Sequence, residues 1–228
     1  LNPSHEYECE AIAKALGFKT VALSSRVSPL MKLVFRGDTT VVDAYLSPVL
    51  NSYIEEFEKH ITPPGLFFMQ SNGGLVDRTH FSGKDSLLSG PAGGVVGAVK
   101  TCLNIGFHKV IGFDMGGTST DVSHYDGEYS ISDENMIAGV RVRTPVIDIH
   151  TIAAGGGSIV SFDGQRFRVG PHSAGAHPGP ACYRNNGPLT ITDCNLLLAR
   201  IQKDFFPKVF GEAGNEPLDQ EIVKEKID

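Results

Sequence analysis

The sequence predicts an α/β fold built around a glycine-rich β-hairpin, and three observations support this prediction. The segment "TTVVDAYLSPVLNSYIEEFEKH" (residues 39–60) repeats apolar residues at the spacing of an amphipathic helix. The run "LFFMQSNGGL" is a short apolar strand that ends in a polar, glycine-bearing turn. The stretch "IGFDMGGTSTDVS" joins two strand-like runs through Gly116 and Gly117. Helix, strand and hairpin patterns therefore occur in one chain.

The composition limits the class of protein. The 228 residues are enough for one large domain or two small lobes, and 41% hydrophobic with 20% charged residues is ordinary for a globular chain. A net charge of −6 argues against a nucleic-acid partner or an anionic membrane, because phosphate surfaces require clustered Lys and Arg. The four cysteines form no CxxC pair, which favours a reduced, cytoplasmic protein with buried thiols.

The first half of the chain predicts a strand followed by a long helix. "KTVALSS" (residues 19–25) has the pattern of a short buried strand. The helix over residues 39–60 takes Thr39 or Thr40 as N-cap, and Pro48 should kink or split it. Its apolar stripe is expected to face the core and comprises Val42, Tyr45, Leu46, Val49, Leu50, Tyr53, Ile54 and Phe57.

A second helix is predicted in "SLLSGPAGGVVGAVKTCLNIG", with Ser89 as N-cap and Pro91 near its first position. Gly93, Gly94 and Gly97 lie inside it, and each lowers helix stability by about 0.8–1 kcal/mol relative to Ala. Such a cost indicates either a ligand or backbone that comes close, or tight packing of the helix on a sheet.

The second half predicts strands, glycine turns and a short helix. "VRVRTPVIDIH" alternates like a strand and leads to Gly155, Gly156 and Gly157, while the Asp163-Gly164 pair between two alternating runs predicts a hairpin. "SAGAHPGPACYRNNGP" has the composition of a loop. "TITDCNLLLARI" predicts a helix capped by Thr192 or Asp193, and the segment from Phe205 predicts a loop that leads to another helix.

The hairpin "FDMGGTSTD" offers the groups that a nucleotide phosphate requires: backbone N–H donors, hydroxyl donors and a carboxylate for the accompanying metal. It is neither a GxxxxGK[ST] loop nor a dinucleotide fingerprint, because its glycines lead into a strand and not into a helix. A purely structural hairpin is the alternative. The candidate residues are Asp114, Gly116, Gly117, Thr118, Ser119, Thr120 and Asp121.

Five motifs in order, "SNGGL", "SGPAGGVVGA", "IGFDMGGTSTDVS", "DIHTIAAGGGS" and "VGPHSAGAHPGPACY…TITDCNL", resemble the hydantoinase A/5-oxoprolinase family, especially its eukaryotic-type 5-oxoprolinase branch. The resemblance covers nearly all of residues 1–205. Two departures follow the hairpin. "CYRNNG" stands where bacterial members have "CYGRGG", and Cys194 stands where Ala is usual.

The resemblance implies part of an actin, sugar-kinase and heat-shock-chaperone-like ATPase fold, in which two lobes each supply a phosphate hairpin. Asp114–Asp121 matches the second hairpin, and the first has no counterpart in this chain. We therefore expect a fragment with three parts: an α/β segment (1–106), a second-lobe segment with the hairpin and glycine loops (107–205), and a tail leading to a missing C-terminal region (206–228). The absence of an initial Met agrees with this expectation.

The function implied is ATP-dependent opening of a cyclic amide, 5-oxo-L-proline, to L-glutamate with ADP and phosphate. In that scheme Asp114 and Asp121 are catalytic, Gly116–Thr120 and Gly155–Gly157 bind the nucleotide, and Asp121 joins Asp148 and His150 around Mg²⁺ or another divalent cation. The metal role rests on the expectation that Asp148 and His150 share one strand face. A hydrogen-bonded structural histidine is the alternative for His150, and His177 is either close to substrate or a loop-ordering residue.

Three alternatives remain open at the level of sequence. The substrate is hydantoin or its N-methyl form, the chain is a nucleotide-binding or interaction module without turnover, or it belongs to a small-molecule kinase. The kinase reading leaves "SAGAHPGPACY" unexplained. The resemblance also implies a hydantoinase B-like region, fused or separate, and a homo-oligomer for the full-length protein, with this segment inactive by itself.

Overall fold

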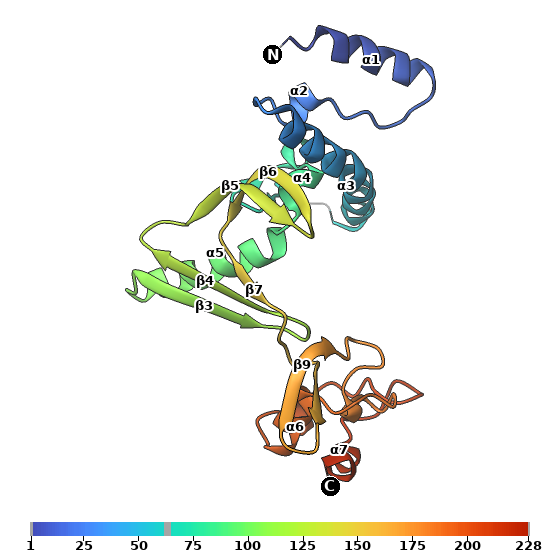
Figure 1. The fold of residues 1–228 in the computed structure, drawn as a ribbon, viewed down its shortest axis with the longest axis vertical. Helices are drawn as coiled ribbons and strands as arrows, with labels where there is room; N and C mark the ends of the chain where they lie inside the picture. Colours follow the sequence, from blue (N-terminus) through green and yellow to red (C-terminus); the bar gives the residue numbers. More distant parts are fainter. Residues whose placement is uncertain (1, 62–64, 228) are drawn as a thin grey trace. The chain divides into compact units, whose positions relative to one another are not determined.

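The computed structural model describes residues 2–61 and 65–227, and it confirms the α/β class (Figure 1). The chain divides into two compact units. The first comprises Leu1–Gly112 and Ser123–Ile149, and the second comprises Phe113–Val122 and His150–Asp228. No helix within the described ranges is long and apolar enough to cross a bilayer.

The first unit contains five α-helices and two short antiparallel sheets among its described residues. The helices are α1 (Ser4–Ala15), α2 (Ser24–Val27), α3 (Leu33–His60), α4 (Gly83–Ser86) and α5 (Ser89–Asn104). The sheets are formed by β1 (Phe68–Met69) with β2 (Leu75–Val76), and by β5 (Ile131–Ile137) with β6 (Val140–Ile147). The β5–β6 hairpin packs against α3 and α4 through β6 (Figure 1).

The strand predicted for residues 19–25 is wrong. Residues 20–23 have no regular secondary structure, and Ser24 begins α2. The Glu6 carboxylate of α1 accepts hydrogen bonds from the Ser24 hydroxyl at 2.6 Å and from the Ser25 amide at 2.9 Å. These contacts satisfy donors at the start of α2 and lower the pKa of Glu6 to about 2, with the Ser24 hydrogen bond as the largest cause.

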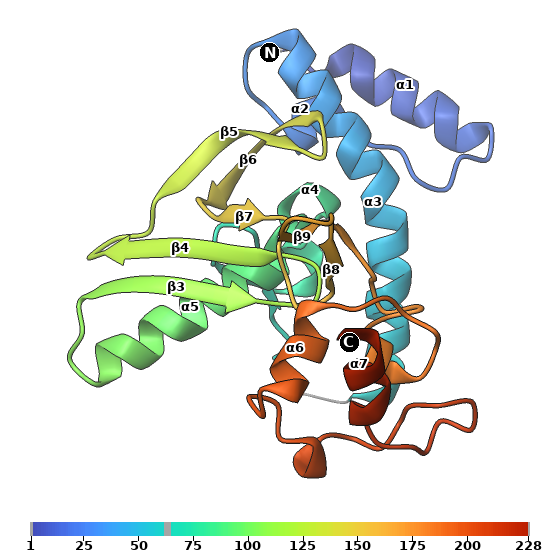
Figure 2. The same ribbon diagram turned by 60° about the horizontal axis from the view of Figure 1, so that its bottom comes forward.

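Helix α3 begins before the predicted N-cap. Lys32 is the N-cap, and the hydroxyls of Thr39 and Thr40 each donate at 2.7 Å to the carbonyl four residues earlier, so both residues lie inside the helix. The helix continues through Pro48, so the predicted split is absent, and Figure 2 shows α3 as a single long helix. The pyrrolidine ring removes one backbone donor, but the rest of the helix persists on both sides.

The apolar stripe of α3 is only partly buried. Ile54 is fully buried, as predicted, but Tyr45 is 77% exposed, Val49 71% and Tyr53 65%. The prediction that the whole stripe packs in the core is therefore wrong for this chain. The spacing establishes an amphipathic helix, but it does not reveal which neighbouring element covers each part of the stripe.

Helix α5 supplies the core of the first unit. Ala92, Val95 and Val99 pack with Ile147 of β6, while Leu88, and not Ser89, is the N-cap. The helix was therefore predicted correctly except for its start. An added Cβ at Gly97 would meet nothing within 4 Å, and one at Gly93 would make only an ordinary contact with Met69. Within the described residues, neither glycine is required by tight helix-on-sheet packing.

The predicted hairpin is formed by β3 (Lys109–Met115) and β4 (Thr120–Asp126), and β7 (His150–Ile152) is the third strand of the sheet in the order β3-β4-β7. Strands β4 and β7 are antiparallel, with Asp121 opposite Thr151. A turn at Asp126-Gly127 follows β4, since Tyr125 and Tyr129 form an antiparallel bridge across it.

The second unit contains the confirmed Asp163-Gly164 hairpin, formed by β8 (Ser158–Phe162) and β9 (Phe167–Ser173), followed by α6 (Ile191–Leu197) and α7 (Gln220–Ile227) (Figure 1). Its core contains Cys182, Leu196, Leu218 and Val223. The N-cap of α6 is Thr190 and not Thr192 or Asp193, because Asp193 occupies the third helical position and completes a capping box with Thr190.

Candidate functional site

The turn between β3 and β4 carries most of the predicted site residues. Asp114 lies near the end of β3 and is exposed, as are Gly116, Gly117 and Thr118. The Gly116 amide donates to the Ser119 carbonyl at 2.9 Å, which closes the turn. The structure therefore presents this glycine-hydroxyl turn to solvent at the end of two paired strands, where a ligand can reach it.

The triple glycine packs directly against this turn. The Gly156 amide donates to the Gly116 carbonyl at 3.0 Å, and the Gly157 amide donates to the Gly117 carbonyl at 2.6 Å. A Cβ at Gly155 would lie 2.6 Å from the Gly117 carbonyl, closer than any real side chain comes. Glycine is required here because the two backbones touch. A role as support for the hairpin turn is thus visible in the geometry.

The start of α6 holds the glycine loop in turn. Both the backbone amide and the hydroxyl of Thr192 donate to the Gly156 carbonyl, at 2.7 and 2.9 Å. The Ala174 amide donates to the Gly157 carbonyl at 2.8 Å. The sequence predicted Thr192 only as a helix cap, since nothing in its local pattern indicates a partner so far along the chain.

These contacts decide which groups of the turn remain available. The carbonyls of Gly116 and Gly117 are occupied by the glycine loop. Among the hydrogen bonds of residues 2–61 and 65–227, none is donated by the backbone amides of Gly117, Thr118 or Ser119. Consecutive free amides beside hydroxyl side chains form the kind of concave donor set that binds phosphate oxygens. The residues present therefore fit a nucleotide phosphate.

Thr120 does not belong to this donor set. Its side chain is buried, and its hydroxyl donates to the Ala154 carbonyl at 2.6 Å. Because a hydroxyl has a single proton to donate, Thr120 cannot donate to a phosphate at the same time. In this structure the Thr120 hydroxyl is therefore engaged by the protein itself. Its bond instead fixes the segment after β7 to the start of β4.

Asp121 has a partner that the sequence did not reveal. The Thr151 hydroxyl donates to Oδ1 of Asp121 at 2.7 Å across the β4–β7 pair. Thr151 is part of the "DIHTIAAGGGS" motif, but only the strand register places it opposite Asp121. Asp121 is half-buried and Thr151 is exposed, so the pair remains open to solvent on one side.

The structure does not support the assumption behind the predicted metal site, that Asp148 and His150 share one strand face. Asp148 and His150 do not share a strand, because β6 ends at Ile147 and β7 begins at His150. His150 lies opposite Val122, and not opposite Asp121. Within the part of the chain that the structure describes, no three His, Cys, Asp or Glu side chains are grouped to hold a metal ion.

The loop that follows β9 is organised by a buried carboxylate. Asp193 is fully buried and accepts four hydrogen bonds, from the Ala181, Cys182 and Thr190 amides and from the Thr190 hydroxyl, at 2.8–3.1 Å. Burial is the largest cause that raises the pKa of the Cys182 thiol far above its usual value, and the neighbouring Asp193 raises it further. His177, in the same loop, is exposed. Cys182 is thus a structural thiol, and all four cysteines are free.

The departure at "CYRNNG" has a structural consequence. The Arg184 guanidinium pairs with Glu216 at 3.0 Å and with Asp219 at 2.8 Å, and it donates to the Pro217 carbonyl at 2.9 Å. Arg184 therefore ties the loop to the segment that leads into α7. None of these contacts involves the hairpin turn.

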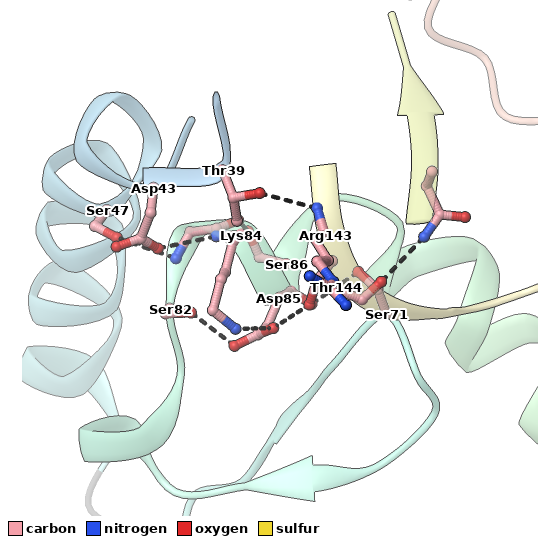
Figure 3. Close-up of polar contacts among 12 residues, drawn as sticks. Thr39, Asp43, Ser47, Ser71, Ser82, Lys84, Asp85, Ser86, Arg143 and Thr144 are labelled. Carbon is pink, nitrogen blue, oxygen red and sulfur yellow. Dashed lines mark hydrogen bonds and ion pairs between the residues drawn. The ribbon is translucent and has the colours of Figure 1, made fainter. Parts of the chain in front are cut away.

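A second polar cluster, in the first unit, was not predicted (Figure 3). The Asp85 carboxylate accepts hydrogen bonds from Lys84 at 2.6 Å, Thr144 at 2.5 Å and Ser82 at 2.7 Å. Burial raises the pKa of Asp85, but these hydrogen bonds and the charge of Lys84 outweigh it, so the pKa lies below its usual 3.8.

The cluster positions the turn after β1. The backbone carbonyl of Asp85 accepts from both the amide and the hydroxyl of Ser71, each at 2.7 Å. Ser71 is fully buried, and its hydroxyl accepts from the Leu88 amide at the start of α5. Gly73 has a φ of +81°, and a Cβ there would collide with Ile147. The "SNGG" turn is therefore held rigidly, although no ligand-binding group is identified in it.

Comparison with known proteins identifies the family. Residues 36–228 match the Hydantoinase/oxoprolinase family model. The chain is 51% identical over 230 residues to a 5-oxoprolinase of Saccharomyces cerevisiae and 48% identical over 231 residues to 5-oxoprolinase 1 of Arabidopsis thaliana, in each case across 99% of this chain. The crystal structure of ATP-dependent caprolactamase from Pseudomonas jessenii superimposes with a TM-score of 0.73 at 34% identity.

These matches cover almost all of this chain but only a small part of each relative. The chain spans 18% of the length of the yeast and plant relatives, and 33% of the caprolactamase chain. The matches nevertheless include every motif described above, from the "SNGG" turn to α6. The chain belongs to the hydantoinase/oxoprolinase family.

Proposed function

We propose that the chain is part of an ATP-dependent cyclic-amide hydrolase that opens 5-oxo-L-proline to L-glutamate, with release of ADP and phosphate. The main support is the identity of 48–51% over 99% of the chain to proteins named 5-oxoprolinase. The structural likeness to an ATP-dependent caprolactamase supports the same class of reaction, hydrolysis of a ring amide. The exposed turn with free amides is the feature of this chain that fits the ATP requirement.

The chemistry explains why ATP is needed. Nitrogen resonance makes the lactam carbonyl carbon a poor electrophile for water. Transfer of the γ-phosphoryl group to the carbonyl oxygen releases ADP and forms an O-phosphorylated, activated carbon. Water then adds to that carbon, and the ring C–N bond breaks as the nitrogen takes up a proton to give the amine, which leaves an acyl phosphate. A second water hydrolyses the acyl phosphate to the carboxylate and free phosphate. Such phosphoryl transfer is accelerated mainly by positioning and charge stabilisation.

In this scheme the hairpin holds the β- and γ-phosphates. The amides of Gly117, Thr118 and Ser119 donate no hydrogen bond within the described residues, and the hydroxyls of Thr118 and Ser119 add two further donors. Mg²⁺ or another divalent cation, when bound, would neutralise the phosphate charge. Asp121 and Asp114 are the carboxylates available to orient the cation's water ligands or the attacking water. Gly155–Gly157 support the turn from behind.

The assignment is tested by measuring ADP release from a protein that contains this chain and is as long as its relatives. We expect 5-oxo-L-proline to stimulate ADP release, and Asp121→Asn to lower the stimulated rate by at least 100-fold. Asp126→Asn is the matched control, because Asp126 is on the same strand but is exposed and, among the described residues, pairs only with Lys109. Its rate should therefore stay within about twofold of wild type. Failure of the lactam to stimulate ADP release would contradict the proposal and favour a binding module without turnover.

A second substrate class deserves a direct comparison because of the caprolactamase match. Caprolactam, hydantoin and N-methylhydantoin share the ring amide, but they lack the carboxylate of 5-oxo-L-proline. We expect kcat/KM for 5-oxo-L-proline to exceed that for each of them by at least 100-fold. A higher value for any of the three would reassign the substrate and leave the reaction class unchanged.

We also propose that a hydantoinase B-like region, fused or separate, accompanies the chain, and that the whole protein is a homo-oligomer. The support is indirect, since the chain spans 18% of the length of its relatives. Light scattering of the full-length protein, with mass spectrometry of its subunits, would measure both properties. A monomer without any additional region would contradict both.

A further inference from the structure

We infer that Thr151 is a positioning residue that holds the Asp121 carboxylate in its working orientation. The inference rests on the proposed function, because it assigns a role to a residue that touches Asp121 and not the nucleotide itself. Its starting observation is the 2.7 Å hydrogen bond from the Thr151 hydroxyl to Oδ1 of Asp121. Thr151 then acts on the reaction only through the carboxylate that it orients.

The register of the sheet makes this contact specific. Asp121 and Thr151 are directly opposite residues of β4 and β7, so their side chains share one face and start from neighbouring Cβ atoms. Threonine is β-branched, and its χ1 angle has few accessible values, so its hydroxyl has a defined direction. A hydrogen bond to a carboxylate is also stronger than one between neutral groups. The pair therefore restricts the rotation of Asp121.

The surrounding contacts keep Thr151 in place. The Thr120 hydroxyl of β4 donates a hydrogen bond to the Ala154 carbonyl at 2.6 Å, which anchors the chain beyond β7 to β4. The amides of Gly156 and Gly157 bind the turn carbonyls at 3.0 and 2.6 Å. The segment 151–157 is thus fixed to the hairpin at several points, and Thr151 cannot shift away from Asp121 without breaking them.

The second carboxylate oxygen of Asp121, Oδ2, remains available to a ligand. Thr151 engages Oδ1, and among the described residues no side-chain hydrogen bond or ion pair engages Oδ2 of Asp121. The pair is open to solvent, because Thr151 is exposed and Asp121 is half-buried. An exposed bond of this kind contributes little to folding, so its value lies in the direction that it gives to Oδ2. Misplacement of a catalytic group by about 1 Å can reduce a rate by on the order of 100-fold.

The test compares two substitutions in the full-length protein. Thr151→Val keeps the shape but removes the hydroxyl, and Thr151→Ser keeps the hydroxyl. We expect Val to lower the lactam-dependent kcat by about 10- to 100-fold and to raise the Mg²⁺ concentration for half-maximal rate, as is typical for residues that orient a ligand group. Ser should remain within about threefold of wild type. Thr101→Val should change neither quantity, because Thr101 is exposed and its hydroxyl donates to the Gly97 carbonyl of its own helix.

A double-mutant cycle with Asp121→Asn separates positioning from structure. If Thr151 acts through Asp121, Thr151→Val should have no further effect on kcat once Asp121 is Asn. A full additional loss in that background, or a Val variant within twofold of wild type, would overturn the inference. Equal thermal midpoints for wild type, Val and Ser would show that the change in rate is not a change in folding.

Nucleotide binding distinguishes failure of the inference from failure of the proposed function. If wild type shows no lactam-dependent ADP release, the proposed function is contradicted. The positioning role of Thr151 is then tested by the Kd for Mg-ADP of wild type and variants, measured by calorimetry. A Kd about tenfold weaker for Val, restored by Ser, would then support the positioning role. An unchanged Kd would overturn it, and a wild-type protein that binds no Mg-ADP would overturn both proposals.

Discussion

The carboxylates of Asp85, which is largely buried, and Asp193, which is fully buried, are stabilised by different means. Asp85 has a cationic partner, Lys84, and two hydroxyl donors. Among the described residues Asp193 forms no ion pair, and it instead accepts hydrogen bonds from three backbone amides and one hydroxyl. A buried charge is tolerated only when it is paired or well hydrogen-bonded, and both sites satisfy that condition within the described residues. Each carboxylate should therefore respond differently to pH and to substitution.

Asp85→Asn should destabilise the first unit by about 3–5 kcal/mol at pH 7, because it leaves Lys84 with no anion in a site where both side chains are under 20% exposed. The pKa of Asp85 is lowered by folding, so its contribution is fully present above its usual pKa of 3.8 and is lost as the pH falls through the lower folded value. Urea unfolding of wild type and variant at pH 7, 4 and 2.5 measures this difference.

The control for this experiment is Asp133→Asn, since Asp133 is exposed in the same unit. Its variant should unfold within about 0.5 kcal/mol of wild type, as is usual for surface positions. A gap between wild type and Asp85→Asn that stayed constant from pH 7 to pH 2.5 would contradict the assignment of the stabilisation to the ionised carboxylate.

Asp193→Ala should destabilise the second unit by about 3 kcal/mol or more, because it leaves several buried backbone amides without an acceptor, each costing about 1–3 kcal/mol. Hydrogen exchange should show the loss of protection at the Ala181, Cys182 and Thr190 amides. Glu212→Ala, at an exposed position in the same unit, provides the comparison and should leave exchange unchanged. Retained protection in Asp193→Ala would show that another acceptor replaces the carboxylate.

At the level of elements, the glycine clusters divide into those that are required and those that are not. Gly155 touches the hairpin turn, where a Cβ would overlap backbone atoms, whereas Gly97 lies on an open face of α5. Substitution by alanine should therefore change the free energy of unfolding in opposite directions at the two positions. The sequence alone showed only that both were glycine.

Gly155→Ala should destabilise the protein by about 1–3 kcal/mol, because the new methyl group forces the glycine loop away from the turn. Gly97→Ala should stabilise it by about 0.5–1 kcal/mol through a better helix propensity. Thermal unfolding of both variants measures the pair. Loss of stability at Gly97, or none at Gly155, would contradict the packing described here.

Elements with a strong local signal were predicted well. The Asp163-Gly164 hairpin and the β3–β4 hairpin follow from turn residues between alternating runs, and α5 follows from its apolar spacing. The strand expected at residues 19–25 was wrong because extended, apolar segments form strands only where a partner strand is available. The α3 stripe was only partly right, since exposure depends on what surrounds the helix.

For the whole molecule, a single phosphate hairpin should bind nucleotide poorly. The motif DxGGT occurs once in the 228 residues, and the family resemblance implies a second hairpin on the opposite side of ATP. We expect calorimetry of residues 1–228 to give a Kd for Mg-ADP weaker than about 100 μM, about 10-fold or more above that of the full-length protein. Micromolar binding by this chain alone would show that one hairpin is sufficient.

The sequence by itself determined the family, the α/β class and the position of the exposed glycine-hydroxyl turn, because these depend on motifs that are local and ordered along the chain. Only the tertiary structure decided how the turn is held. Strand register placed Thr151 against Asp121, backbone contact explained the triple glycine, and a hydrogen bond to Ala154 removed Thr120 from the donor set. Each of these contacts joins residues about 30 or more positions apart, and local patterns of residues do not specify such distant pairings.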